Sequence, residues 1–221
     1  GILGLTTEQV FVKRLFDVVV SLIGIIITTP LILIVAVLIK LTSKGPAFYI
    51  QERMTKGNRT FKLIKFRTMH QGAEDLSGPV LSGENDPRVT PLGKILRKTR
   101  IDELPQLFNV LKGDMSLVGP RPERPFFVEK FINDIPEYEY RFSVKAGITG
   151  FAQILGRYDT SPEDKLRYDL MYIRNYSLLL DIKLILQTIK VLFTPGSSSK
   201  TVHAITQAGV ESAVTKEKRH K

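Results

Sequence analysis

The sequence predicts a membrane-associated α+β protein that is mostly helical. Three observations predict this fold: a long apolar run near the N-terminus, a short β-hairpin pattern behind it, and several later segments with apolar residues at helical spacing. The 221 residues suit one domain with appendages, and the net charge of +10 points to an anionic partner. Nucleic acid, a phosphorylated small molecule and an acidic membrane surface all fit that charge. The chain has no cysteine, which excludes disulfides and thiolate metal sites.

The apolar run from Leu15 to Ile39 is long enough to enter a membrane as a helix, since about 20 residues cross a bilayer. It is apolar on all sides, which argues against the buried helix of a soluble protein. It is also too long for a signal peptide, and no small-residue cleavage site follows it. Pro30, directly after Thr29, predicts a kink or break inside the run.

The charged flanks of this run leave its topology open. Lys13 and Arg14 precede it, and Lys40 and Lys44 follow it. Positive flanks prefer the cytoplasm, so a helix–break–helix hairpin would place both flanks on one face. A kinked spanning helix and a shallow interfacial helix remain alternatives.

A β-hairpin is predicted next, with strands at 47–53 and 60–68 and a turn at 56–58. Its second strand carries cations that either bind an anion or form a solvated face: Lys62, Lys65 and Arg67. Residues 71–90 are rich in Gly, Ser, Asp, Asn and Pro and are predicted to form a long loop.

Helical patterns fill most of the remaining chain. They cover residues 91–98, 104–111, 126–135, 162–175 and 178–193, with Thr90 and Ser161 as N-caps of the first and fourth. The last segment is strongly apolar and fits either an amphipathic helix in the membrane interface or a core helix.

Two neighbouring carboxylates, Asp102 and Glu103, come just before the second of these helices. We expect Asp102 at or near the N-cap, with Pro105 in the first turn. There the helix dipole would hold Asp102 ionised, and an ionised carboxylate can act as a nucleophile or bind a metal. The alternative is a common helix cap beside a solvated Glu103.

Arg121 lies between two prolines, which stiffen the backbone on either side. A guanidinium held in this way loses less entropy on binding and can grip a phosphate with two hydrogen bonds. The alternative is a rigid connector with a solvent-facing arginine.

Together these residues indicate phosphoryl transfer at a membrane, with Mg²⁺ held by carboxylates and substrate phosphate, and a lipid-linked acceptor. No P-loop, kinase glycine loop or HExxH motif is present. Nucleic-acid binding is a rival function, but no recognition motif supports it. A non-catalytic membrane scaffold that binds anionic lipid or a glycan-assembly partner is another.

Short motifs recur in a fixed order along the chain: KRLFD at 13–17, GPAFY at 45–49, KFRTM at 65–69, DELPQ at 102–106, GPRP at 119–122, GITG at 147–150, and Tyr176-Ser177 with Asp181. With these motifs the chain resembles the bacterial sugar transferases over roughly residues 12–194. These are monotopic polyprenyl-phosphate phosphoglycosyl transferases. Within that family it is most similar to the catalytic part of undecaprenyl-phosphate hexose-1-phosphate transferases. Thr29 stands where the family has Ser, Tyr176 where it often has Trp, and Ala146 where it often has Pro.

The resemblance implies a re-entrant helix hairpin broken at Thr29-Pro30, in the bacterial inner membrane, with the catalytic domain on the cytoplasmic face. It implies transfer of a sugar 1-phosphate from a UDP-sugar to undecaprenyl phosphate. The protein could act as a homo-oligomer, but the sequence does not fix its oligomeric state. That reaction is the first membrane step of exopolysaccharide, capsule or O-antigen biosynthesis.

The resemblance also implies roles for single residues. Asp102 matches the nucleophile, which forms a covalent phosphosugar intermediate, and Glu103 matches the neighbouring Mg²⁺ ligand. Arg121 is expected near phosphate. Weaker candidates for donor contacts are Arg67, Arg88, Arg100, Lys145, Gln153 and Arg157, and Asp169 is a candidate to support the metal and cation network.

We therefore expect four parts: an N-terminal segment (1–12), a re-entrant membrane helix (13–44), a catalytic domain (45–195) and a basic C-terminal tail (196–221). The chain is expected to be either the catalytic part of a longer protein or a short member of the family.

Overall fold

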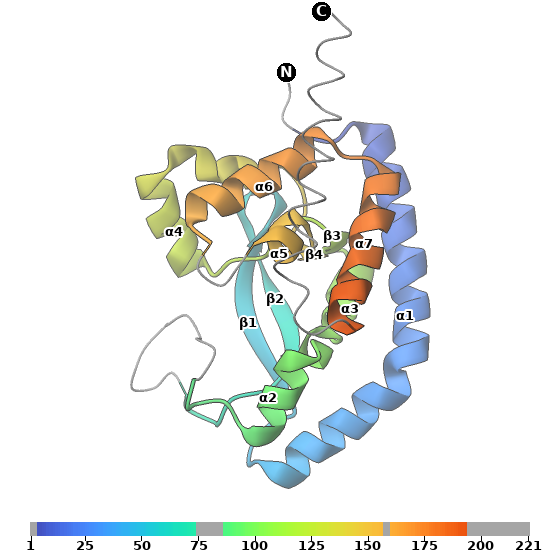
Figure 1. Ribbon diagram of the computed structural model, residues 1–221, viewed down its shortest axis with the longest axis vertical. Coiled ribbons are helices and arrows are strands. Elements are labelled where there is room, and N and C mark those ends of the chain that lie inside the picture. Colours follow the sequence, from blue (N-terminus) through green and yellow to red (C-terminus); the bar gives the residue numbers. More distant parts are fainter. Residues whose placement is uncertain (1–3, 74–85, 157–159, 194–221) are drawn as a thin grey trace, which may run out of the picture.

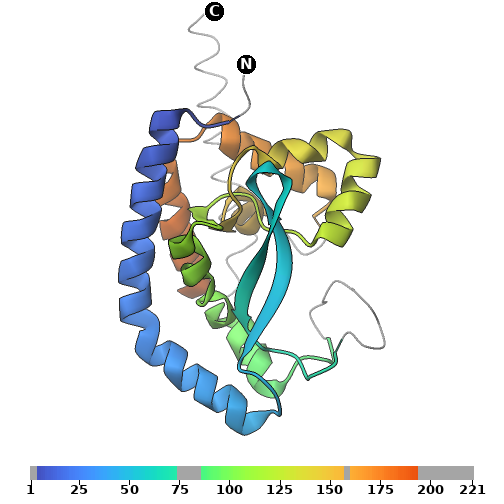
Figure 2. The same cartoon turned by 180° about the vertical axis from the view of Figure 1, so that it is seen from behind.

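The computed structural model describes residues 4–73, 86–156 and 160–193 (Figure 1). The predicted C-terminal tail and most of the predicted 71–90 loop lie outside these residues. Within them, the protein is mostly helical with two small sheets, and a long N-terminal helix runs along one side (Figures 1 and 2). The predicted α+β class is confirmed at this level.

This N-terminal helix is α1 (Thr7–Thr42), which a capping box between Thr6 and Gln9 begins. It continues through Pro30, and its axis bends part-way along without reversing direction (Figures 1 and 2). The hydroxyls of Thr28 and Thr29 donate to carbonyls one turn back, each at 2.7 Å. Such bonds beside a proline are a known cause of helix bending. Of the kink or break that Pro30 predicted, the structure therefore has a bend within one continuous helix, and the re-entrant insertion of this helix stays a prediction.

The surface of α1 is unusually apolar for one that faces outward. Its most apolar stretch has a mean hydropathy of 3.0, and only 17% of that stretch is buried against the rest of the protein. Among the described residues, α1 is the one helix long and apolar enough to cross a membrane. A large exposed apolar surface marks contact with a membrane or a partner, whereas a core helix would be mostly buried.

The N-terminal half of α1 is attached to the body by polar contacts. Arg14 donates to the carbonyls of Val110 and Leu111, at 2.6 and 2.8 Å, in α3 (Gln106–Lys112). Lys13 Nζ and Asp181 Oδ2 form a buried ion pair of 2.5 Å with α7 (Leu178–Phe193).

Asp17 adds a third attachment, because its Oδ1 accepts hydrogen bonds from Ser116 Oγ and Leu117 N, both at 3.0 Å. Ser116 and Leu117 belong to β3 (Ser116–Val118). The KRLFD motif thus fixes the membrane helix to three separate elements.

The predicted hairpin is confirmed. Strands β1 (Phe48–Thr55) and β2 (Arg59–Phe66) pair antiparallel around a 3₁₀ turn, η1 (Lys56–Asn58). In this register Tyr49 faces Lys65 and Arg53 faces Phe61, so Tyr49, Arg53 and Lys65 share one face.

A second sheet was not predicted. It is a parallel pair of short strands, β3 and β4 (Gly147–Thr149), and it joins the GPRP and GITG motifs. A Cβ atom on Gly147 would lie 2.0 Å from the Gly119 nitrogen, so only glycine permits this approach.

The predicted helices are confirmed to within a few residues. They are α2 (Pro91–Lys98), α3, α4 (Pro125–Asp134), α6 (Pro162–Arg174) and α7. Thr90 and Ser161 cap α2 and α6 as predicted. Two further elements were not predicted: α5 (Phe151–Leu155) and η3 (Pro136–Ser143), a 3₁₀ helix.

Helix α7 combines the two alternatives that the sequence left open. Leu184 is buried in the main core with residues of β2, α3, β3 and α6. Leu179 and Leu186, by contrast, are each 60% exposed. One side of α7 is a core helix, and its other side presents apolar residues as an interfacial helix would.

Candidate active site

The DELPQ segment follows α2 through a tight turn. Arg100 adopts a left-handed conformation (φ 58°), and a 3₁₀ turn, η2 (Ile101–Glu103), leads into α3. Asp102 lies inside η2, and the residue that flanks α3 is Pro105, without a side-chain cap. Asp102 therefore lies near the start of α3, as predicted, but in the 3₁₀ turn before it and not at its N-cap.

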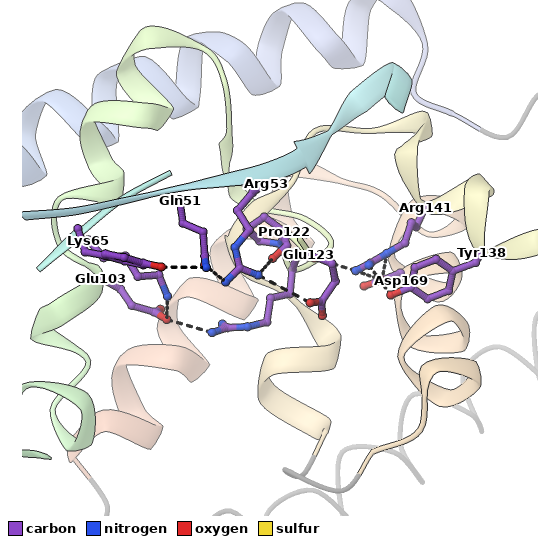
Figure 3. A network of polar contacts seen from close by, with 11 residues as sticks. Gln51, Arg53, Lys65, Glu103, Pro122, Glu123, Tyr138, Arg141 and Asp169 are labelled. Carbon is purple, nitrogen blue, oxygen red and sulfur yellow. Dashed lines mark hydrogen bonds and ion pairs between the residues drawn. The ribbon is translucent and has the colours of Figure 1, made fainter. Parts of the chain in front are cut away.

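Glu103 is surrounded by cations from three parts of the chain. Its Oε1 lies 3.2 Å from Lys65 Nζ (Figure 3), 3.2 Å from Arg121 Nη2 and 3.8 Å from Arg100 Nη1. Burial alone would raise the pKa of Glu103, but these cations outweigh it and lower the pKa to about 2. Glu103 is thus a firmly ionised carboxylate.

Asp102 has the opposite environment. It is 8% exposed, and its Oδ1 is buried with no hydrogen-bond partner among the described residues. Burial, followed by repulsion from Glu103, raises the pKa of Asp102 above its usual value, although Lys65, Arg97 and Arg100 oppose this. The expectation that a helix start stabilises its charge is therefore not met. A poorly solvated carboxylate with a free oxygen is instead suited to react.

A small recess opens beside Lys65 and Arg121, the two cations nearest Glu103. Its lining comes from β1, β2, α3 and the two glycine-containing motifs: Arg53, Leu63, Lys65, Gln106, Arg121, Pro122 and Gly147. Two of these side chains carry buried nitrogens without a partner among the described residues, namely Arg53 Nε and Gln106 Nε2. Hydrogen-bond donors and cations therefore dominate the recess, as an anionic ligand requires.

Buried arginines hold the backbone around Arg121 in place. Arg141 Nη2 donates to the Arg121 carbonyl at 2.8 Å, and Arg53 Nη1 donates to the Pro122 carbonyl at 3.0 Å. Arg141 itself is held by Asp169, at 2.9 Å from Nη2, and by the Tyr138 hydroxyl at 2.6 Å (Figure 3). The stiffness predicted from the prolines is reinforced by these contacts.

Asp169 lies in this supporting layer, away from Glu103. Burial raises the pKa of Asp169 to about 6, against the attraction of Arg141. Asp169 was predicted to support the cation network. In the structure it contacts Arg141, and Arg141 in turn donates a hydrogen bond to the Arg121 carbonyl.

The other predicted donor contacts lie elsewhere. Arg67 donates to the carbonyls of Ser43 and Lys44 at the end of α1. Arg88 forms a 2.6 Å ion pair with Asp86. Neither contact tests a role toward a donor, so both roles stay predictions.

Among the described residues, neither Lys145 nor Gln153 forms a hydrogen bond or ion pair with Asp102 or Glu103. Lys145 precedes Ala146, whose N–H donates to Thr55 at the end of the hairpin opposite Lys65. Gln153 lies in α5 with both side-chain polar atoms buried and without a described partner. Arg157 lies outside the described residues.

Several site residues were missed by sequence reasoning. Lys65 was predicted only as one of three strand cations with an open role, and Gln106 lies inside the DELPQ motif, which could have indicated it. Arg53 could have been found from the hairpin register, which places it on the same face as Lys65. Arg141 gave no signal, because only the tertiary fold brings it to Arg121.

Glu103 also fits a minimal metal site. The described residues contain no group of three or more His, Cys, Asp or Glu that could hold a metal alone. Mg²⁺ usually takes one or two carboxylates together with substrate phosphates. Glu103, which its neighbours keep ionised, could provide the protein carboxylate of such a set.

A carboxylate pair, a cation-lined recess and an attached apolar helix are features that phosphoryl transfer at a membrane would require. Comparison with known proteins identifies the family to which this chain belongs. The bacterial sugar transferase family model matches residues 8–195, and this chain belongs to that family.

Several similar proteins are named as sugar-phosphate transferases that use undecaprenyl phosphate. The chain is 48% identical over 187 residues to an Aeromonas hydrophila protein named UDP-N-acetylgalactosamine-undecaprenyl-phosphate N-acetylgalactosaminephosphotransferase, covering 83% of this chain and 44% of that one. It is 51% identical over 164 residues to a putative undecaprenyl-phosphate N-acetylgalactosaminyl 1-phosphate transferase of Bacillus subtilis, covering 74% and 82%.

A Klebsiella pneumoniae UDP-glucose:undecaprenyl-phosphate glucose-1-phosphate transferase is 44% identical over 182 residues, covering 80% of this chain and 39% of that one. The chain thus spans less than half the length of the Aeromonas and Klebsiella relatives.

Proposed function

We propose that this protein transfers a sugar 1-phosphate from a UDP-sugar to undecaprenyl phosphate, early in the synthesis of a surface polysaccharide. The observation that carries the proposal is the carboxylate pair: Glu103 is held by three cations, and Asp102 beside it keeps a buried oxygen free. The names of the relatives support the acceptor and the class of reaction.

In the first step the carboxylate of Asp102 attacks the β-phosphorus of the donor. A bond forms between the Asp102 oxygen and phosphorus, the bond to the UMP oxygen breaks, and UMP leaves with its electron pair. The product is a phosphosugar ester of Asp102. Arg121 and Lys65 border the recess and offset the negative charge of the diphosphate.

In the second step a phosphate oxygen of undecaprenyl phosphate attacks the same phosphorus. The bond to Asp102 breaks, which restores the free carboxylate and releases the lipid diphosphate sugar. The exposed apolar surface of α1 supports a membrane position in which a lipid acceptor reaches this site.

Glu103 is the residue proposed to hold Mg²⁺, which when bound would neutralise charge on the diphosphate. The role of Glu103 is then to stay ionised, which its low pKa of about 2 supports. Lys65 and Arg121 keep it oriented from two sides.

We also propose that α1 enters and leaves the cytoplasmic leaflet on the same side, so that the recess faces the cytoplasm. The bend of α1 and the basic residues at both of its ends support this topology (Figure 1).

The test is an assay of UMP release in detergent or membranes, with a panel of UDP-sugars and undecaprenyl phosphate. We expect one or a few donors to give turnover, Asp102→Asn to abolish it, and Glu103→Gln to lose the Mg²⁺-dependent activity while remaining folded. A protein that acts only as a scaffold would release no UMP from any donor and would function normally with both carboxylates neutralised.

A further inference from the structure

Gln106 is the most deeply buried polar side chain of the recess. It is 2% exposed, it lines the recess together with Lys65 and Arg121, and its Nε2 has no hydrogen-bond partner among the described residues. Buried polar atoms are nearly always hydrogen-bonded, because leaving one without a partner costs the desolvation of that group. A donor kept in this state at the wall of a recess indicates a ligand that supplies the acceptor.

The chain places this amide next to the reactive carboxylate. Leu104 and Pro105, the two turn residues between η2 and α3, both have right-handed helical angles, so the chain passes from η2 into α3 without reversing direction. Gln106 is the first residue of α3 and follows Asp102 by four positions, and Lys65, which lines the recess with Gln106, also acts electrostatically on Asp102. Each of the two carries a buried polar atom without a described partner: Oδ1 of Asp102 and Nε2 of Gln106.

One group would satisfy both atoms. A phosphoryl group offers phosphorus to the Asp102 oxygen and non-bridging oxygens to a neighbouring N–H. The charge on those oxygens grows as the carboxylate attacks, and a fixed donor aimed at them lowers the barrier. An amide suits this place better than a further cation, because a cation beside Asp102 would form an ion pair with it and lower its reactivity.

We propose that Gln106 is a catalytic residue whose Nε2–H binds a non-bridging oxygen of the phosphoryl group that Asp102 attacks. This inference rests on the proposed function and adds a role to it. Gln106 does not act on Glu103, which the cations Lys65, Arg100 and Arg121 already surround.

The first experiment compares wild type with Gln106→Met, which keeps the size and removes the amide. In single-turnover UMP release we expect the rate to fall by roughly 10²- to 10³-fold, as when an oxyanion donor is removed. KM for the donor should stay within a few-fold, because the contact strengthens in the transition state. Gln106→Glu, which offers only acceptors and a charge, should lose at least as much.

Val110→Ala is the matched control. Val110 is fully buried on the same helix and does not line the recess. This variant should lower the thermal midpoint without slowing UMP release per folded molecule. If Gln106→Met does not fold, the rate of UMP release by Gln106→Glu is compared with that of wild type instead.

The second experiment uses donors with sulfur in place of one or the other non-bridging β-phosphoryl oxygen. Wild type should turn over one diastereomer more slowly, because sulfur accepts hydrogen bonds weakly, and Gln106→Met should lose that part of the discrimination. A rate within about threefold of wild type in both Gln106 variants, or unchanged discrimination, would overturn the inference. Absence of UMP release by wild type with every donor would instead overturn the proposed function.

Discussion

At the residue scale, Asp102 and Glu103 are neighbours with opposite electrostatics. Cations hold the pKa of Glu103 low, while burial and the Glu103 charge raise the pKa of Asp102. The same 3₁₀ turn, η2, therefore holds the firmly ionised Glu103 and, next to it, the more reactive carboxylate of Asp102. The sequence predicts the pair but not this difference, which depends on Lys65 and Arg121 arriving from distant segments.

Arg121→Lys tests the geometry of the site at this scale. Lysine keeps the charge but cannot bind Glu103 and a phosphate through one planar group. We expect kcat/KM for UMP release to fall by about 10- to 100-fold, since one or two charge-assisted hydrogen bonds are lost. Arg167→Lys is the control, because Arg167 is exposed on α6 and pairs with Asp164. Equal activities of the two variants would contradict a role for the guanidinium.

At the element scale, the loop between β3 and α4 depends on support from η3 and α6. Arg141 contacts Asp169, the Tyr138 hydroxyl and the Arg121 carbonyl, and it is 2% exposed. A buried arginine with these partners specifies where the loop lies as well as stabilising it. The position of Arg121 is thus set from behind the site.

Arg141→Met should destabilise the protein by about 3–5 kcal/mol, because Asp169 is left buried without its cation. Burial already raises the pKa of Asp169 to about 6, and loss of Arg141 would raise it further. A raised folded-state pKa favours the folded state below the unfolded pKa of about 3.9, and this benefit disappears as the pH rises through the folded value.

The stability difference between wild type and Arg141→Met should therefore be larger at pH 8 than at pH 5. Urea unfolding at the two pH values measures it, with Arg141→Lys as a variant that keeps the charge. A difference independent of pH would mean that Asp169 does not carry the effect.

The elements predicted well are those with local signals. The hairpin and the helices from α2 onward follow from period, caps and turn residues in one stretch of sequence. The β3–β4 pair joins strands of three residues that lie far apart in the chain, so no periodicity reveals it. η3 has no regular apolar pattern, and Arg100 adopts a left-handed conformation that nothing in its neighbours indicates.

At the scale of the whole molecule, an apolar helix is attached to a basic body along one side (Figure 2). The attachments are polar near the start of α1, through Lys13, Arg14 and Asp17, and apolar near its end, through Ile32, Val35 and Ile39. The site and α1 therefore belong to one packed unit. If α1 is inserted in a membrane, the depth of its insertion sets the distance between the recess and the membrane surface.

Single cysteines test the topology of α1, since the chain contains none. We expect Glu8→Cys and Lys44→Cys, placed at opposite ends of α1, both to react with a membrane-impermeant maleimide from the cytoplasmic side. Lys183→Cys on α7 serves as the reference for the catalytic body. Labelling of either end from the outside alone would mean that α1 spans the membrane.

The central claim is that Asp102 forms a covalent bond to the phosphosugar. The protein is incubated with its UDP-sugar in the absence of undecaprenyl phosphate, quenched rapidly and measured by intact mass spectrometry and peptide mapping. We predict UMP release equal to the number of active sites, with a mass increase of one sugar phosphate on the Asp102 peptide that disappears on adding the acceptor and is absent in Asp102→Asn. UMP release that occurs only with the acceptor present, without any adduct, would contradict the account.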